Sequence, residues 1–410
     1  MALIVQKYGG TSVADAERIR NVARRIAARH KGGDRVVAVV SAMGDTTDGL
    51  LKLARQISDH PEARELDVLL STGEMVTKTL LAMALHALDI DAVSLTGAQA
   101  GLRTDASHGR ARILEVDTDR VLRELESGRV VVVAGFQGIT EEMEVTTLGR
   151  GASDLTPVAL AAALKADGCE IYTDVEGIYT ADPRIEPKAR CLRDISYDEM
   201  LELSALGARV LHPRAAELAS VHGIPVVVAS SFTDAPGTRI HGGELMEQFK
   251  KVRAIAHDFD VAKVTVRGVP DRPGIAAGIF EPLAEHHVSV DTIVQNASAE
   301  KLTDLTFTLA VEDVGKAVPL MERLAKEIGA REVVADDSLG KVSVVGTGIQ
   351  TTPGYAARTF RALSDAGVNV EMISTGEIRI TVIVRRDDVQ KAVQALHRAF
   401  ELETADPSEL

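Results

Sequence analysis

The stretch VQKYGGTSVADAERIR, residues 5–20, joins an apolar strand pattern to an amphipathic helix pattern through a lysine, two glycines and two hydroxyl side chains. Glycines lack a Cβ, so their backbone N–H groups can approach an anion closely. The amino end of the following helix adds partial positive charge. These features are typical of a phosphate cradle. A tight strand-to-helix turn would use the same residues, so the junction by itself leaves both interpretations open.

The alternation of short β-branched runs and longer amphipathic stretches continues to about residue 230. After the first strand, Ile19, Val22 and Ile26 recur at helical spacing. Strands that alternate with helices predict an α/β sheet covered by helices on both faces. The predicted buried strands are residues 35–41, 91–96, 129–136, 169–174 and 224–230.

Length and composition narrow the class of protein. A chain of 410 residues with 45% hydrophobic and 26% charged residues fits two or three globular domains. The net charge of −14 argues against a nucleic-acid partner. No run reaches the roughly 18 apolar residues of a membrane span, and a strand pattern begins at Ala2 in place of a signal peptide. Cys169 and Cys191 lack metal-ligand spacing. We expect a cytoplasmic protein without a membrane partner.

The last third of the chain contains an internal repeat. Residues 273–293 align with 353–373 at an offset of 80, and residues 312–318 align with 387–393 at an offset of 75. Each copy predicts a strand, a helix opened by Pro-Gly, two strands and a second helix. The repeat could be a duplicated packing unit. It could also be a pair of small-molecule sensing modules, because helix amino ends and strand ends can form a polar pocket between similar modules.

Three further polar stretches occur before the repeat, and the first and last of them follow predicted strands. VVSAMGDTTD (39–48) is rich in small and hydroxyl residues, TTLGRGASD (146–154) places an arginine between glycines, and YTDVEGIYTADPR (172–184) combines a ring, carboxylates and a guanidinium. The Ser-Asp pair that ends the second stretch also fits an ordinary cap of the next helix. Together the four loops favour a site for a polar ligand.

These loops resemble, in order, those of the aspartate kinase branch of the amino-acid kinase family, over essentially the whole chain. The matching motifs are KYGGTS, SAMG, STGE (71–74), TTLGRGASD, YTDVEGIYTADPR and GARVLHPRA (207–215). The repeat resembles the family's pair of amino-acid-sensing ACT modules. The resemblance implies an α/β amino-acid-kinase-type sheet sandwiched by helices, followed by two ferredoxin-like (βαββαβ) ACT modules. The implied ranges are 1–232 for the kinase domain, 233–260 for a linker, 261–335 for module 1 and 336–405 for module 2.

The resemblance implies ATP-dependent phosphorylation of the β-carboxylate of L-aspartate, the first step of the lysine, threonine and methionine biosynthetic route. Mg²⁺ would be carried by the nucleotide, with no metal bound by the protein itself. A carboxylate with a pKa near 4 is already ionised at pH 7, so the nucleophile needs no general base. The reaction needs close placement of two anions and neutralisation of charge during transfer.

The family's site residues carry over to matching positions in this sequence. Lys7 and Asp154 are the implied catalytic pair. The implied aspartate-binding residues are Thr47, Glu74, Arg150 and Ser153, with Glu74 on the α-ammonium and Arg150 on the α-carboxylate. The implied nucleotide-binding residues are Lys7, Gly9, Gly10, Ser12, Ser41, Thr173, Asp174, Tyr179, Asp182, Arg184 and Arg209.

The chain departs from the family pattern G-R-G-G-S-D-T-T-A, because residues 149–157 read GRGASDLTP. Ala152 would be strained if its position required a positive φ. Pro157 falls in the first turn of the predicted helix, where proline is tolerated. Arg209 replaces a lysine found in some members. We expect activity to survive the GRGASDLTP departure, whose effect on the affinity for aspartate stays open at the level of sequence.

For the modules, the resemblance implies inhibition by threonine, lysine or both. The implied effector contacts are Asp271, Gly274, Gln295 and Asn296 in module 1, and Asn369, Glu371 and Ser374 in module 2. Ordinary hydrogen bonding at strand ends is the alternative for Gln295 and Asn369. The implied assembly is a homo-oligomer, or an α2β2 assembly whose β subunit starts near Met246.

Two other functions stay open at the level of sequence. A kinase of the same fold could use another carboxylate, such as glutamate or N-acetylglutamate. The GRGASDLTP departure also allows a catalytically degenerate regulator that binds amino acids without turning them over.

Overall fold

Strand β1 (Leu3–Tyr8) lies inside an eight-stranded sheet, and the glycine-rich junction follows its carboxyl end. The computed structural model describes residues 1–149, 151–208, 210–242, 251–296 and 302–404. All five predicted buried strands are confirmed. The strands in sheet order are β10 (Asp194–Ser196), β12 (Thr238–His241), β11 (Val226–Ser230), β9 (Gly168–Thr173), β1, β2 (Arg35–Val40), β6 (Val130–Ala134) and β3 (Ala92–Leu95).

The strands β11, β9, β1, β2, β6 and β3 run parallel to one another, so their carboxyl ends meet at one edge of the sheet. Only the pairing of β12 with β11 is antiparallel among the described strands of this sheet. Loops that leave the carboxyl ends of parallel strands form the usual ligand site of an open α/β sheet. The four polar stretches begin at the ends of β1, β2, β8 (Val145–Thr147) and β9.

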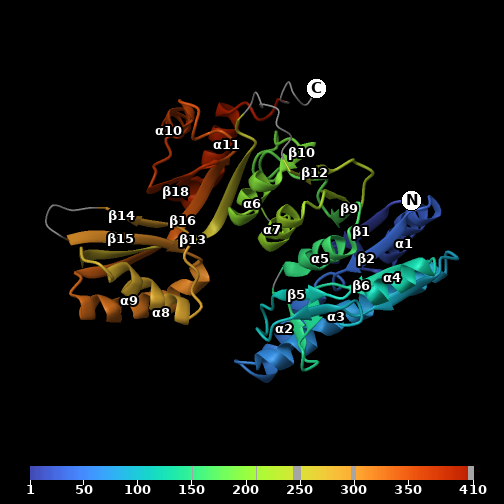
Figure 1. Cartoon of the computed structure of the whole chain (residues 1–410). Coiled ribbons are helices and arrows are strands. Elements are labelled where there is room, and N and C mark those ends of the chain that lie inside the picture. The colour runs from blue at the N-terminus through green and yellow to red at the C-terminus, as the bar shows by residue number, and fades with distance from the viewer. Residues whose placement is uncertain (150, 209, 243–250, 297–301, 405–410) are drawn as a thin grey trace.

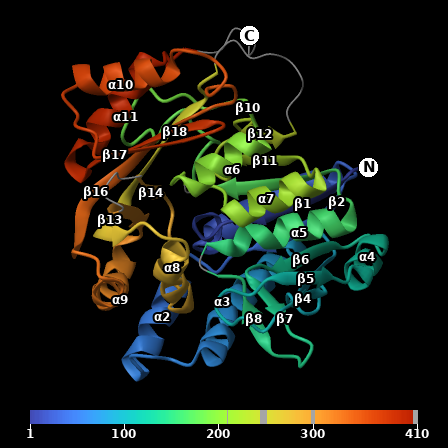
Figure 2. The same ribbon diagram turned by 60° about the vertical axis from the view of Figure 1, so that its left-hand side comes forward.

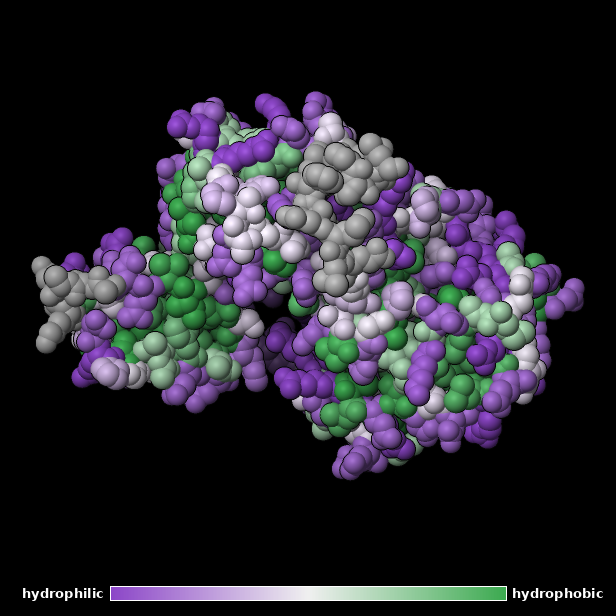
Figure 3. Space-filling model, turned by 45° about the horizontal axis from the view of Figure 1, so that its top comes forward, coloured by the Kyte–Doolittle hydropathy of each residue, from purple (hydrophilic) through white to green (hydrophobic). Residues whose placement is uncertain are grey.

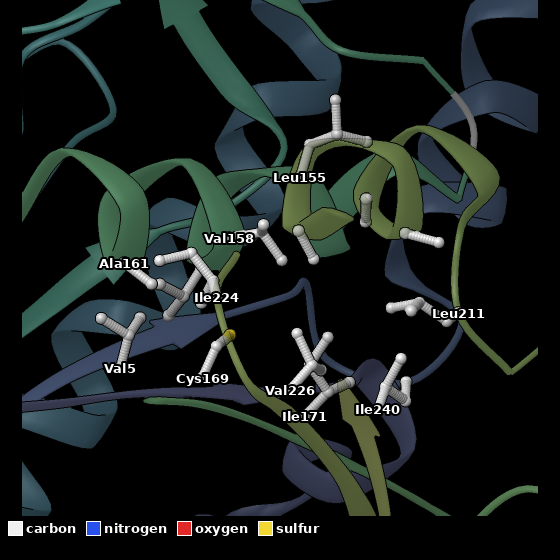
Figure 4. Close-up of a cluster of buried hydrophobic side chains, with 14 of the residues drawn as sticks. Val5, Leu155, Val158, Ala161, Cys169, Ile171, Leu211, Ile224, Val226 and Ile240 are labelled. Atoms are coloured by element: carbon white, nitrogen blue, oxygen red, sulfur yellow. The ribbon is translucent and has the colours of Figure 1, made fainter. Parts of the chain in front are cut away.

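Helices cover both faces of this sheet (Figure 1). On one face, α1 (Ala16–Lys31) and α3 (Ala63–His86) pack their apolar side chains against Val36 and Ala38. On the other face, α5 (Leu155–Leu164) packs over Val37 and Val39 together with α4 (Asp119–Glu126), α6 (Tyr197–Ala205) and α7 (Pro213–His222). Figure 4 shows the centre of this second core between α5 and the strands. Neighbouring residues of β2 face opposite cores because side chains alternate along a strand.

A small four-stranded sheet stands beside the main sheet. Its order is β5 (Ile113–Val116), β4 (Leu102–Thr104), β7 (Gln137–Ile139) and β8. The hairpin of β7 and β8 leads directly into the residues 148–154. Helix α2 (Thr46–Ile57) packs against α3 near this sheet. The small sheet therefore fixes where the GRGASD stretch begins.

By length and composition, α3 is the one described helix that could cross a membrane, and half of its apolar window is buried within the protein. Its buried face also carries Asp67, Glu74 and Lys78. A core helix that contributes polar groups to a site has these properties, whereas charged groups are costly inside a lipid bilayer.

The C-terminal repeat forms one six-stranded sheet, with the order β14-β15-β13-β16-β18-β17. Both copies contain the predicted strand, helix, strand, strand and helix. The first copy has β13 (Ala254–Pro270), α8 (Ile275–Glu285), β14 (Ile293–Gln295), β15 (Leu302–Leu309) and α9 (Val314–Ile328). The second has β16 (Glu332–Val345), α10 (Tyr355–Asp365), β17 (Met372–Gly376), β18 (Arg379–Arg385) and α11 (Val389–Ala399).

The two modules share their long strands. The later part of β13, residues 261–270, pairs with β15 and with the start of β16, which closes module 1 as βαββαβ. Residues 254–258 of the same strand pair with residues 341–345, which supplies the fourth strand of module 2 from a position before module 1 in the chain. The range 233–260, predicted as a linker, thus contains β12 and the beginning of β13.

Module 2 is fastened to the N-terminal region by hydrogen bonds and ion pairs. Thr180, in the loop after β9, lies 2.9 Å (Oγ1 to Nε2) from His397 of α11. Glu202 of α6 forms an ion pair with Arg379 of β18 at 3.0 Å. Figure 3 shows an open gap between the lobe of module 1 and the N-terminal region, and Figure 2 shows α10 and α11 to the upper left of α6 of that region.

Candidate active site

The loops that follow β1 and β2 meet the amino-terminal half of α3 and the GRGASD stretch around a cavity of about 430 Å³. Five of the predicted site residues line this cavity. They are Gly10, Ser41, Thr47, Glu74 and Ser153. Asp67 and Thr147 also line it, although sequence reasoning did not single them out. The structure therefore brings together loops from positions as far apart as 10 and 153.

Lys7 and Asp154 form a buried ion pair. Their Nζ and Oδ1 atoms are 2.8 Å apart, and the two side chains are 10% and 9% exposed. The other carboxylate oxygen of Asp154 accepts a hydrogen bond from the backbone N–H of His212, at 3.2 Å. Asp154 makes no capping hydrogen bond to α5. The capping interpretation of this residue is therefore wrong, because its carboxylate binds Lys7 and the amino end of α7.

The junction after β1 folds as a single 3₁₀ turn, Gly10–Val13. The Gly9 N–H is already used, since it donates to the carbonyl of Tyr172 at 3.1 Å. Ser12 is buried, and its Oγ has no hydrogen-bond partner among the described residues. A buried hydroxyl is costly without a partner, so this atom is suited to donate to a ligand oxygen. Sequence reasoning predicted both residues beside the phosphates, and the structure offers the Ser12 hydroxyl rather than the Gly9 N–H.

Glu74 is an almost fully buried carboxylate on α3, with 3% of its surface exposed. Its Oε1 accepts from the Ala42 N–H at 3.1 Å, while its Oε2 has no partner among the described residues. Burial raises the pKa of Glu74 to about 7, against the opposing effect of backbone hydrogen bonds. Helix and loop approach closely here because residue 73 is glycine. A Cβ at Gly73 would lie 2.7 Å from that of Ala42.

A polar stripe on α3 escaped sequence reasoning. Asp67, Ser71, Glu74 and Lys78 are all buried and recur at intervals of four, three and four residues. This spacing places them on one face of the helix. Polar residues at helical spacing in an otherwise apolar helix were a signal that could have been detected in the sequence, beyond the STGE motif.

The GRGASDLTP departure is compatible with the fold. Left-handed backbone occurs at Gly149 and Gly151, with φ of 105° and 76°. Ala152 lies in a short 3₁₀ turn, Ala152–Asp154, and is not among the residues with positive φ. Pro157 is the third residue of α5, within its first turn as predicted. The expected source of strain at Ala152 is therefore absent from this turn. Arg150 and Arg209 lie outside the described residues.

Lys7, Gly9 and Ser12 are not among the residues that line the cavity, and neither are Thr173 at the end of β9 and the predicted nucleotide residues of the loop after it, Asp174, Tyr179, Asp182 and Arg184. Thr173 Oγ1 donates to Asp174 Oδ1 at 3.1 Å. Tyr179 forms a backbone bridge with Cys191. Arg184 forks onto Asp182 with a shortest distance of 2.7 Å, and this pairing holds the pKa of the Asp182 carboxyl below its usual value. Arg184 is well exposed, so the pair stands at the surface.

The predicted effector residues occupy different places in the two modules. In module 1, Asp271 and Gly274 precede α8, Gln295 ends β14 and Asn296 follows it. In module 2, Asn369 donates to Glu371 at 3.2 Å, Glu371 pairs with Lys263 of module 1 at 3.4 Å, and Ser374 lies on β17. The hydrogen bond of Asn369 is thus the ordinary local contact named as its alternative. Met246 lies outside the described residues.

Comparison with known proteins identifies the family of the chain. The amino acid kinase family matches residues 2–230, and the ACT domain matches residues 264–329 and 342–400. The aspartate kinase Ask_LysC of Stutzerimonas stutzeri is 50% identical over 405 residues, which cover 98% of each chain.

Two solved structures of aspartokinase III from E. coli are 27% identical and cover 97% of this chain and 99% of theirs. The complex with aspartate and ADP in the R-state has a TM-score of 0.82, and the complex with lysine and aspartate in the T-state has a TM-score of 0.73. The family match over more than half of the chain, and the identity along nearly its whole length, settle its relationship. The chain belongs to the aspartate kinase branch of the amino acid kinase family and carries two C-terminal ACT domains.

Proposed function

We propose that this kinase transfers the γ-phosphoryl group of ATP to the β-carboxylate of L-aspartate and forms 4-phospho-L-aspartate, the first step of lysine, threonine and methionine biosynthesis. One observation carries the proposal. Glu74 lines the cavity with an oxygen that has no partner among the described residues, and Ser153 of the same lining is followed directly by Asp154, whose carboxylate pairs with the Lys7 ammonium. Transfer from a phosphoryl donor requires a cation such as Lys7, and binding of an amino-acid acceptor requires a carboxylate such as Glu74 for its ammonium group.

On the nucleotide side, bound Mg²⁺-ATP supplies the phosphoryl group. Lys7 Nζ contacts that group and offsets its charge during transfer. Asp154 keeps the Lys7 ammonium in place and is itself held by the His212 N–H. The Ser12 hydroxyl, which has no partner among the described residues, donates to a phosphate oxygen. The further proposed contacts of the nucleotide are Gly9, Gly10, Ser41, Thr173, Asp174, Tyr179, Asp182, Arg184 and Arg209.

On the acceptor side, Glu74 binds the α-ammonium of aspartate through its unpartnered Oε2. Thr47 and Ser153 line the same cavity and add hydroxyl hydrogen bonds. Arg150 forks onto the α-carboxylate. The β-carboxylate attacks the phosphorus directly, because it is already ionised at neutral pH. An N-acylated substrate has no ammonium for Glu74, which disfavours N-acetylglutamate.

Inhibition by threonine, lysine or both is the regulatory part of the proposal. The contacts of module 2 with the loop after β9 support it, since Thr180 and His397 join that loop to α11. The proposed effector contacts are the seven residues predicted from the sequence, namely Asp271, Gly274, Gln295, Asn296, Asn369, Glu371 and Ser374. An effector coupling of about 1–3 kcal/mol would change apparent affinity or activity roughly 5- to 150-fold.

Trapping of the acyl phosphate with hydroxylamine tests the reaction and the effectors together. Purified protein with Mg²⁺-ATP should form hydroxamate from L-aspartate, and threonine or lysine should suppress it. Glutamate and N-acetylglutamate are the matched alternative substrates. Equal turnover of either one would contradict the choice of aspartate. Absence of any hydroxamate from folded protein that still binds threonine or lysine would favour the degenerate regulator.

The assembly and the location in the cell stay predictions, namely a homo-oligomer or an α2β2 assembly in the cytoplasm. Expression of the natural coding sequence should yield a second, shorter chain if translation also starts at Met246. Replacement Met246→Leu should remove that shorter chain and leave the full chain. A single chain from both sequences would exclude the internal start.

A further inference from the structure

Two segments that contact each other form one wall of the site. The first is the end of β8 at Thr147, together with Leu148, which follows the strand. The second is the loop 105–111 between β4 and β5. The Ala111 N–H donates to the Thr147 carbonyl at 2.9 Å, so the two segments lie side by side. Thr147, Gly109 and Gly151 all line the cavity.

Asp67 of α3 joins these two segments from one side. Its Oδ1 accepts from the Thr147 hydroxyl at 2.5 Å, and its carboxylate accepts from the Gly109 N–H at 3.0 and 3.1 Å. The Nδ1 atom of His108 lies 3.0 Å from Oδ2. Asp67 is 1% exposed, so its oxygens are occupied by these groups, in contrast to the unpartnered oxygen of Glu74.

Arg214 of α7 joins the same two segments through other atoms. Its Nη1 donates to the Leu148 carbonyl at 2.8 Å, and its Nη2 donates to the Ala111 carbonyl at 3.0 Å. The rigid planar fork of a guanidinium holds two acceptors at a fixed separation, which a lysine cannot do. Partial burial, followed by the nearby charge of Arg112, lowers the pKa of Arg214.

We propose that Asp67 and Arg214 are positioning residues that together hold residues 147–148 against the loop 105–111 and thereby fix the cavity wall that Gly109, Thr147 and Gly151 form. Neither Asp67 nor Arg214 needs to touch the substrate. The inference rests on the proposed binding of aspartate in this cavity. Loss of either contact displaces the wall, and a displacement of about 1 Å can cost about 100-fold in rate.

The test uses a matched pair of variants at Thr147 in the full-length enzyme. Thr147→Val removes the hydroxyl that donates to Asp67 and keeps the side-chain shape, whereas Thr147→Ser keeps the hydroxyl. We expect Thr147→Val to raise the KM for aspartate about 10-fold and to leave the KM for ATP within about twofold. Thr147→Ser should restore most of the affinity for aspartate.

Arg214→Lys gives the second arm, because it keeps the charge and loses the fork. It should raise the KM for aspartate by a similar factor, again with little effect on the KM for ATP. The contacts of Thr147 with Asp67 and of Arg214 with its two carbonyls hold the same wall of the cavity. The double variant Thr147→Val/Arg214→Lys should therefore raise the KM for aspartate by less than the product of the two single increases. Asp67→Asn should be the most severe variant, since its amide would face the Gly109 N–H.

Equal kinetics of the Val and Ser variants would overturn the proposal, as would a parallel rise in both KM values, which a general loss of structure would produce. The wild-type chain separates this inference from the proposed function in the same assay. If the wild type forms no aspartyl hydroxamate, the proposed function fails. If it does so and the Thr147 variants behave alike, only the role of Asp67 and Arg214 fails.

Discussion

Two buried carboxylates of the active site, Asp154 and Glu74, differ in what surrounds them. Asp154 is neutralised by Lys7 at 2.8 Å and accepts from the His212 N–H. Glu74 receives one backbone N–H, from Ala42, and burial raises its pKa to about 7. A buried charge is costly unless it is paired. Asp154 is therefore paired within the protein, whereas Glu74 keeps one oxygen without a partner among the described residues.

The largest expected effect is the loss of turnover when the ion pair of Lys7 and Asp154 is broken. Lys7→Ala should lower kcat for aspartyl hydroxamate at least about 1,000-fold, because the phosphoryl group loses its cation and Asp154 is left buried without one. Effector binding, measured by calorimetry, should persist, since the modules lie elsewhere. A loss of less than tenfold in a folded variant would show that Lys7 does not serve the transfer.

Glu74→Gln tests the unpaired side and should act on affinity. The KM for aspartate should rise about 100-fold, because the amide cannot pair with an ammonium, while the KM for ATP should stay within about twofold. At pH 8 the variant should resist urea at least as well as the wild type, since the charge that it removes is buried and unpaired. A fall in kcat with an unchanged KM for aspartate would show that Glu74 serves the phosphoryl transfer, as proposed for Lys7 and Asp154, and not the binding of aspartate.

The dependence of KM on pH sharpens the comparison further. The pKa of Glu74 is raised, so the protonated form dominates below about pH 7 and the ionised form that binds an ammonium dominates above it. The KM for aspartate should therefore fall about tenfold between pH 6 and pH 8. In Glu74→Gln this dependence should disappear. An equal dependence in the variant would assign the titration to another group.

The same raised pKa has a consequence for stability. The folded state binds the Glu74 proton more tightly than the unfolded state does, so the stability that this group contributes is lost as pH rises from about 4.5 through about 7.

The smallest expected effect concerns regulation. Thr180→Val removes the contact with His397 and should weaken inhibition by threonine or lysine about two- to fivefold. Because Thr180 belongs to the loop after β9, any change in uninhibited kinetics should affect the KM for ATP rather than that for aspartate. Arg358→Ala, on exposed α10, breaks a surface ion pair with Glu401 and is the matched control within module 2. Equal weakening of the inhibition in Thr180→Val and Arg358→Ala would show that the contact of Thr180 with His397 has no specific part in the inhibition.

The two modules share one topology but differ in their connections. Module 2 contacts the kinase domain through α11 and β18, as the pair Glu202–Arg379 shows. Module 1 is joined to module 2 by two ion pairs that exchange equivalent positions, Lys263 with Glu371 and Asp291 with Lys341. Among the contacts named here, module 1 meets module 2, and module 2 meets the kinase domain.

The sequence by itself determined the class of fold, because apolar periodicity and the spacing of glycines are local properties of the chain. The buried strands, helix α1 and both copies of the repeat lie where the pattern predicted them. The resemblance also predicted Lys7, Glu74 and Ser153 as site residues, and the structure places Lys7 beside Asp154.

Only the tertiary structure decided which side chains meet. Asp67 and Arg214 come from helices almost 150 residues apart, and each engages backbone or hydroxyl groups of two other segments. Ser153 and Asp154 look like a helix cap in the sequence, yet Asp154 binds Lys7 of a strand that begins the chain. The sharing of β13 between two modules is likewise a property of strand pairing. The physical reason is that hydrogen bonds and charges act over a few ångströms in space, and separation along the chain does not encode those distances.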